Sequence, residues 1–262
     1  MLRIGCVKYL NARPLIHGWR GPVDFDHPAA LCRKLEQGDL EVALVSSLEL
    51  LRRPKYRIVD GISISSRGEV YSVIVAHRDK LAEVQQIELD PASETSVVLL
   101  QCLLAARRLS PQFLQDGAPI RTEPDLRDLA CVRPSRARLF IGDQAIQFRQ
   151  QNREYRIWDL GEEWKKLTNL PFVFALWLIR PEVSSAGEIA HALRQLRDQN
   201  LQQLDDVISS HGNVSPEFCR KYYSQYLFFD FGEQEKAGLR EFHRRCLLNK
   251  IDVAPDLPLN LV

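Results

Sequence analysis

The segment Val7–Leu15, with the sequence VKYLNARPL, decides how the start of this chain folds. It follows the apolar run Leu2–Val7, which we predict to be a strand, and its polar residues and proline end that strand abruptly. Pro14 suits the first turn of a helix, whereas Asn11 either pairs with backbone groups of the turn or binds a ligand. Open α/β sheets bind their ligands at such strand ends. We therefore expect Asn11 to face a ligand.

The residues that follow alternate between short apolar runs and helical patterns. Val23–Asp26 and Val42–Val45 are predicted to be strands, and Pro28–Glu36 a helix that Gly38 ends. The unbroken apolar run at 42–45 is typical of a strand that is buried on both faces of a parallel sheet. This alternation predicts a parallel sheet covered by helices.

The remainder of the chain suggests a second α/β block and then a return to the first. The predicted strands are Tyr56–Ser65, Val70–Ala76, a weak one around Ile120, Leu139–Asp143 and Pro171–Ile179, and the predicted helices include Val97–Leu109, Gln144–Gln150, Ala186–Ser209, Pro216–Leu227 and Glu233–Leu248. We therefore predict a discontinuous two-lobe α/β fold, with residues 1–75 and 174–262 in one lobe and residues 76–173 in the other. Its ligand would lie in the cleft between the lobes.

Composition narrows the classes of function. Lys and Arg total 35 against 34 for Asp and Glu, so the near-neutral chain argues against nucleic acid as the main partner. No apolar run approaches the roughly 20 residues of a membrane span, and charged residues interrupt the N-terminal apolar stretch. We expect a cytoplasmic protein with a small-molecule ligand and no membrane partner.

The cysteines and histidines carry no recognisable metal site. The 6 cysteines are scattered without a C-x-x-C pair, and the 6 histidines show no metal-ligand spacing. Only His17 lies close to the opening segment. The sequence also lacks G-x-S-x-G, a P-loop and G-x-G-x-x-G, so hydrolase, NTPase and dinucleotide-binding functions lack their motifs.

Two hydroxyl-rich segments precede predicted helices. Ser93–Ser96 stands before the helix that begins near Val97, and Ser46 and Ser47 stand before one at Leu48–Arg53. Free N–H groups at helix starts bind anions, and hydroxyls add donors, although plain N-capping explains the same residues. Ser46 to Glu49 also fits a capping box. Two such sites that face each other across a cleft would suit a dicarboxylate.

Two further polar residues are candidates on the same grounds. Asp143 follows the strand at Leu139 and either shapes a ligand pocket or caps the next helix. Ser72 lies inside the predicted strand Val70–Ala76, where it either donates to a ligand or bonds to the backbone.

With these residues in place, the chain resembles the MqnA menaquinone-biosynthesis proteins, the chorismate dehydratases. The resemblance rests on motifs that run in order over nearly the whole chain: YLNARPL at 9–15, GDLEVALVSS at 38–47, YSV at 71–73, SETS at 93–96, IGDQA at 141–145, DLGEEW at 159–164 and LPFVFALW at 170–177. The first and last of these are the most specific.

The resemblance implies a type II periplasmic-binding-protein-like fold used as an enzyme, a hydro-lyase. The reaction would remove water from chorismate and give 3-[(1-carboxyvinyl)oxy]benzoate, the first step of the futalosine route, with no cofactor or metal. Carried over by motif, Asn11 and Ser72 would act at the reacting centre. The remaining substrate-binding residues would be Ser46, Ser47, Thr95, Ser96 and Asp143.

Two other functions compete with this one. The later pathway enzyme that makes 1,4-dihydroxy-6-naphthoate shares the fold but uses a histidine base, and no histidine lies between His77 and His191. A non-catalytic binding protein or sensor for a small aromatic or dicarboxylic acid is the alternative from a different class.

Overall fold

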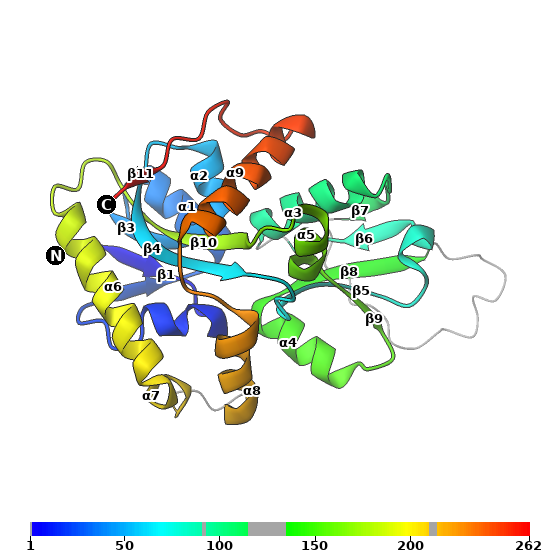
Figure 1. The fold of residues 1–262 in the computed structure, drawn as a ribbon, viewed down its shortest axis with the longest axis horizontal. Coiled ribbons are helices and arrows are strands. Elements are labelled where there is room, and N and C mark those ends of the chain that lie inside the picture. Colours follow the sequence, from blue (N-terminus) through cyan, green and yellow to red (C-terminus); the bar gives the residue numbers. More distant parts are fainter. Residues whose placement is uncertain (1, 91–92, 115–134, 210–213) are drawn as a thin grey trace.

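The computed structural model describes residues 2–90, 93–114, 135–209 and 214–262. The strand expected around Ile120 lies outside these residues. Two groups of strands, each covered by helices, lie side by side along the long axis of the molecule (Figure 1). Among the described residues no helix is long and apolar enough to cross a membrane.

The first sheet contains both ends of the chain. Its described strands run in the order β11-β4-β10-β3-β1-β2, with the bounds β1 Ile4–Cys6, β2 Val23–Phe25, β3 Val42–Ser46, β4 Arg57–Ser66, β10 Phe172–Ile179 and β11 Asn260–Leu261. β1 pairs in parallel with β2 and β3, as the alternation of strands and helices predicts. β10 is antiparallel to both β3 and β4, because it enters from the opposite side, on its return from the second sheet.

The second sheet is formed by the middle of the chain. Its described strands run in the order β7-β6-β8-β5-β9, with the bounds β5 Val73–His77, β6 Gln86–Glu88, β7 Gln112–Leu114, β8 Arg136–Ile141 and β9 Arg156–Asp159. The chain thus changes sheet between Ser66 and Val73 and again between Asp159 and Phe172. The exact lobe boundaries at 75/76 and 173/174 stay a prediction.

The helices cover both sheets. Their bounds are α1 Pro28–Gln37, α2 Ser47–Arg52, α3 Glu94–Ala106, α4 Gly142–Gln151, α5 Leu160–Thr168, α6 Ala186–Gln202, α7 Leu204–Ser209, α8 Pro216–Lys221 and α9 Glu233–Leu248, with 3₁₀ turns at Leu10–Leu15 and Leu81–Glu83 and a π-helical turn at Tyr222–Tyr226. α1 ends as predicted at Gly38, whose left-handed φ of 88° a glycine adopts without strain.

The most apolar strands form the centre of the first sheet. β3 lies between β1 and β10, and Leu44 stands opposite Trp177 with both side chains fully buried. A strand covered on both faces has no polar side to show, which is why its sequence reads as a continuous apolar run rather than an alternation.

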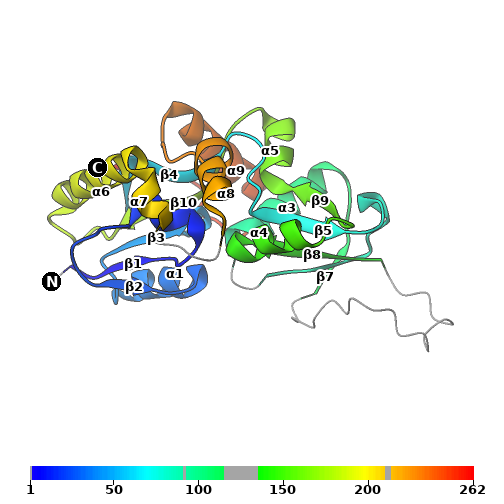
Figure 2. The same ribbon diagram turned by 90° about the horizontal axis from the view of Figure 1, so that it is seen from below.

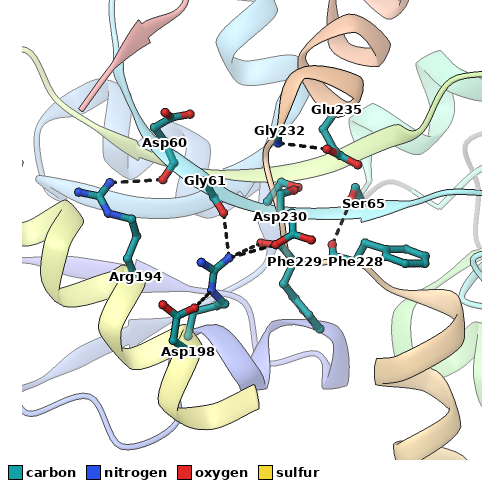
Figure 3. A network of polar contacts seen from close by, with 12 residues as sticks. Asp60, Gly61, Ser65, Arg194, Asp198, Phe228, Phe229, Asp230, Gly232 and Glu235 are labelled. Atoms are coloured by element: carbon teal, nitrogen blue, oxygen red, sulfur yellow. Dashed lines mark hydrogen bonds and ion pairs between the residues drawn. The ribbon is translucent and has the colours of Figure 1, made fainter. Parts of the chain in front are cut away.

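α8 and α9 lie at the junction between the two sheets in both views (Figures 1 and 2). The connection between them is fixed along β4: Ser65 and Phe228 exchange backbone hydrogen bonds of 2.9 Å, and the Ser65 hydroxyl donates to the Phe228 carbonyl (Figure 3). These bonds fix the position of the π-helical turn, which precedes Phe228, relative to β4 of the first sheet.

Candidate active site

A cavity lies between the two sheets and takes its walls from both. Its polar lining comes from the opening segment, from the end of β3, from the residue before β5 and from the start of α3; the lining residues with polar side chains are Tyr9, Asn11, Ser46, Ser72, Ser93, Thr95 and Ser96. The remaining lining is apolar, including Val45, Ile64 and Phe174. Five of the seven residues proposed from the sequence thus face one space.

Asn11 lies on the 3₁₀ turn Leu10–Leu15, which directly follows β1. The helical turn therefore starts at Leu10 and contains Pro14, whereas the sequence had suggested a start at Pro14. The Asn11 Oδ1 atom is buried and has no hydrogen-bond partner among the described residues. A buried carbonyl oxygen without a partner costs about 1–3 kcal/mol, and a ligand donor in the cavity would recover that energy.

Ser72 precedes β5 rather than lying inside a strand as predicted, and its residue is 1% exposed. Its hydroxyl accepts a hydrogen bond of 2.7 Å from the hydroxyl of Tyr222, in the π-helical turn. The preceding residue, Tyr71, has a left-handed φ of 67°, a conformation that costs a non-glycine residue about 1 kcal/mol or more.

The strained turn before Ser72 is held by a buried carboxylate. Asp159 accepts the backbone N–H of Val70 at 3.0 Å and that of Tyr71 at 2.8 Å, and it also caps its own helix α5 through Glu162. The Arg149 guanidinium lies 3.6 Å from the same carboxylate. Burial nevertheless dominates and raises the pKa of Asp159 to about 6.

Ser46 and Thr95 contact each other across the cavity, hydroxyl to hydroxyl. Thr95 also accepts the backbone N–H of Leu48 at 3.2 Å, so a residue of α3 caps the first turn of α2. The capping box predicted for Ser46 and Glu49 is therefore wrong: the Ser46 hydroxyl makes no cap hydrogen bond, and Glu49 pairs with Arg53. Thr95 takes this role because the packing of the two lobes places its hydroxyl within hydrogen-bond distance of the Leu48 N–H.

Ser96 lies beside Thr95 on the first turn of α3 and lines the cavity. Its hydroxyl accepts a hydrogen bond of 2.7 Å from Ser93, so Ser93 does not cap the helix with its side chain. The start of α3 thus presents a pair of hydroxyl groups to the cavity.

Ser47 and Asp143 do not line the cavity. The Ser47 hydroxyl donates to the carbonyl of Val173 at 2.7 Å and so ties α2 to β10. The Asp143 carboxylate accepts the backbone N–H of Leu10 at 2.9 Å, which ties α4 of the second lobe to the turn that carries Asn11. In this structure both residues support the walls rather than face the space.

Tyr9 is a cavity residue that the sequence did not single out, although it lies in the opening segment. Its ring packs against Gly142, where an added Cβ would lie 3.2 Å from the Tyr9 Cγ atom and where φ is 57°. Burial, followed by the charges of Asp90 and Asp143, raises the pKa of the Tyr9 hydroxyl to about 12. Tyr9 is therefore a neutral donor at neutral pH.

The two lobes contact each other beside this cavity. The cavity has a volume of about 70 Å³. Besides the Ser46–Thr95 contact, an ion pair between Arg52 of α2 and Glu94 of α3 joins the two lobes beside it.

The cavity lining is mostly apolar, and its few polar groups do not change charge near neutral pH. Among its described lining residues there is no carboxylate, imidazole, amine or guanidinium. Within the described ranges, no group of three or more His, Cys, Asp or Glu residues is arranged to hold a metal ion. The site offers neutral hydrogen-bond donors and acceptors.

The fold and the position of this cavity define the class: a two-lobed protein with the fold of the periplasmic binding proteins. An Archaeoglobus fulgidus protein of known crystal structure superposes with a TM-score of 0.70 at 18% identity, over 95% of this chain and 97% of that one. The alkanesulfonate-binding protein SsuA from Xanthomonas axonopodis pv. citri gives a TM-score of 0.66 at 14% identity, over 100% of this chain and 97% of its own.

The sequence comparison is more specific. A family model described as menaquinone biosynthesis matches residues 2–247, and the chain belongs to that family. The chorismate dehydratase of Thermus thermophilus is 29% identical over 263 residues, which cover 91% of this chain and 93% of that enzyme. The resemblance to menaquinone-biosynthesis proteins and the fold expected from it are thus confirmed.

Proposed function

We propose that this protein is a chorismate dehydratase, a hydro-lyase that converts chorismate into 3-[(1-carboxyvinyl)oxy]benzoate and water. Membership of the menaquinone biosynthesis family and the likeness to the Thermus thermophilus enzyme support this function over the naphthoate synthase and binding-protein alternatives. In this proposal the enzyme works at the first step of the futalosine route and in the cytoplasm, without a cofactor.

The observation that carries the proposal is the buried, unpartnered Oδ1 of Asn11 in the same inter-lobe cavity as Ser72. Chorismate has a ring hydroxyl that leaves and two carboxylates that stay. A neutral acceptor and a neutral donor in one cavity suit the hydroxyl, since it donates a hydrogen bond before the reaction and accepts one as it departs.

The chemistry needs one proton to leave ring carbon C3 and the hydroxyl to leave C4. The ring carboxylate activates the C3 hydrogen through the diene, so donors to that carboxylate stabilise the charge that develops on proton loss. Ser46, Thr95 and Ser96 are the residues we propose for the carboxylates, with the free N–H groups of α3 adding donors. The C4–O bond then breaks, the ring becomes aromatic, and the departing hydroxide takes up the proton removed from C3 to give water.

The proton acceptor in this proposal is the enolpyruvyl carboxylate of the substrate itself. It is attached to C3 through one ether oxygen and can reach the hydrogen on that carbon. The described lining residues of the cavity include no side chain that is a base at neutral pH, which supports this assignment.

Asn11 and Ser72 are the proposed catalytic residues. Asn11 Oδ1 would accept the hydrogen bond of the C4 hydroxyl, and the Ser72 O–H would donate to the oxygen as it departs. Ser47 and Asp143 would act on the substrate only indirectly, because their side chains hold Val173 and Leu10.

The test is to incubate the purified protein with chorismate alone and follow the aromatic product by liquid chromatography and mass spectrometry. We expect turnover by the natural protein and a fall in kcat of about 100-fold or more for Asn11→Ala and for Ser72→Ala, the usual cost of removing one transition-state hydrogen bond. Ser209→Ala, an exposed serine whose hydroxyl bonds within its own turn, is the control that keeps full activity.

Failure of the natural protein to form the aromatic product refutes the dehydratase function. If it turns over and both cavity variants fold and keep full kcat, the function stands and our assignment of the reacting centre is wrong.

A further inference from the structure

Two side chains of the π-helical turn Tyr222–Tyr226 reach the surroundings of the proposed catalytic residues. One contacts Ser72 itself, and the other contacts Leu10, the residue before Asn11. The Tyr222 hydroxyl donates to Ser72 Oγ at 2.7 Å, and the Tyr223 hydroxyl donates to the carbonyl of Leu10, next to Asn11, at 2.9 Å. Neither tyrosine lies in the lining of the cavity. π-helical turns are rare and are frequently found at functional sites.

The π-helical turn determines the directions in which the Tyr222 and Tyr223 side chains point. The backbone N–H of Leu227 donates to the carbonyl of Tyr222, five residues back, at 3.1 Å, and closes the turn. The next residue, Phe228, is fixed to β4 through Ser65 (Figure 3). The position of the Tyr222 ring is thus set by the first sheet, while its hydroxyl reaches the residue that opens the second.

The hydrogen bond that the Ser72 hydroxyl accepts determines whether this hydroxyl can donate to a ligand. Tyr222 is completely buried, and burial raises the pKa of its hydroxyl, so it stays protonated throughout the pH range of a folded enzyme. Its O–H group donates its one hydrogen bond to Ser72 Oγ. A serine hydroxyl that accepts this bond keeps its own proton for another acceptor, and Ser72 lines the cavity.

We propose that Tyr222 is a positioning residue: its hydroxyl fixes the rotamer of Ser72 and leaves the Ser72 O–H as a donor aimed at the substrate oxygen. This inference rests on the proposed function, because it assigns to Ser72 the departing oxygen of chorismate. Tyr222 itself does not touch the substrate. A chain of two hydroxyls polarises the second donor, so the bond from Ser72 to a developing negative charge is strengthened.

The experiment is a double-mutant cycle with Tyr222→Phe and Ser72→Ala. Tyr222→Phe keeps the ring and removes one oxygen, and we expect kcat to fall about tenfold while KM stays within twofold. In the Ser72→Ala background, Tyr222→Phe should alter kcat by less than twofold, because the Ser72 hydroxyl through which Tyr222 acts on the substrate is already absent. The double variant leaves neither hydroxyl unpaired, so it remains folded and measurable.

Tyr226→Phe is the matched control. Tyr226 lies on the same π-helical turn, but it does not line the cavity, and the Lys221 ammonium lies 5.4 Å from the centre of its ring. We expect unchanged kcat and KM. Thermal unfolding of all variants separates a loss of activity from a loss of fold.

The outcomes separate the two proposals. A tenfold fall that persists in the Ser72→Ala background, or full activity of Tyr222→Phe beside a slow Ser72→Ala, overturns the positioning role and leaves the dehydratase function intact. No turnover of chorismate by the natural protein overturns both. Full activity of Ser72→Ala removes the residue through which Tyr222 would act, and the positioning role with it.

Discussion

Replacing Gly238 by alanine should destabilise the protein although Gly238 lies inside helix α9. In an unpacked helix the change to alanine gains about 1 kcal/mol. Here the added Cβ would lie 2.1 Å from the carbonyl oxygen and 3.1 Å from the carbonyl carbon of Pro171. Both are backbone atoms at the start of β10, so the helix itself must move by more than 1 Å to reach an ordinary contact of about 3.3 Å.

The movement has a second cost. The Pro171 carbonyl also accepts the indole N–H of the fully buried Trp164 at 3.0 Å. Overpacking costs about 1–3 kcal/mol, and distortion of this hydrogen bond adds about 1 kcal/mol. After subtraction of the helix gain, we expect Gly238→Ala to lower the free energy of unfolding by about 2 kcal/mol.

The assay is urea denaturation followed by circular dichroism, with Gly187→Ala as the matched control. Gly187 also lies in a helix, near the start of α6, but an added Cβ there meets no atom within 4 Å. That variant should gain a few tenths to about 1 kcal/mol. The two glycine-to-alanine changes therefore have opposite signs. Equal or greater stability of Gly238→Ala would refute the close approach of α9 to β10.

Two further predictions concern the cavity walls. Thr95→Val removes the acceptor of the buried Leu48 N–H and should lower the free energy of unfolding by about 1–2 kcal/mol in the same assay; an unchanged midpoint would mean that α2 does not depend on this cap. Burial raises the pKa of Asp159 to about 6 from an ordinary 3.8, so its contribution to stability is complete below pH 3.8 and is lost as the pH rises through about 6. Urea denaturation between pH 4 and 7 should show the natural protein losing up to about 3 kcal/mol relative to Asp159→Asn; parallel pH profiles would contradict the burial of this carboxyl.

The central strands of the first sheet were predictable because their signal is local. The runs that became β3 and β10 are almost entirely apolar, as expected of strands that are covered on both faces. The glycine that ends α1 was equally readable. The short strands β6, β7, β9 and β11 were missed, since two to four residues carry too little pattern to separate a strand from a loop.

The polar residues of the site were only partly predictable. Ser46 and Glu49 form a valid capping box by spacing, yet Thr95, 49 residues after Ser46, took the place of that cap. Ser47 has the same residue type and nearly the same position as Ser46 but turns to Val173. Spacing specifies which hydroxyls are near a helix start, whereas competition among distant partners decides where each one points.

The sequence by itself determined the apolar strands, the order of the lobes' elements and, through motif resemblance, the family and most of the residues at the cavity. Only the tertiary structure decided which of them meet. Tyr222 lies 150 residues from Ser72, and nothing in either local sequence links them. Their contact exists because the chain returns to the first sheet. There Phe228 is bonded to β4, and the π-helical turn just before it places the Tyr222 hydroxyl at Ser72. Burial then leaves the Tyr222 hydroxyl with Ser72 as its partner, a condition that packing imposes and that no local pattern contains.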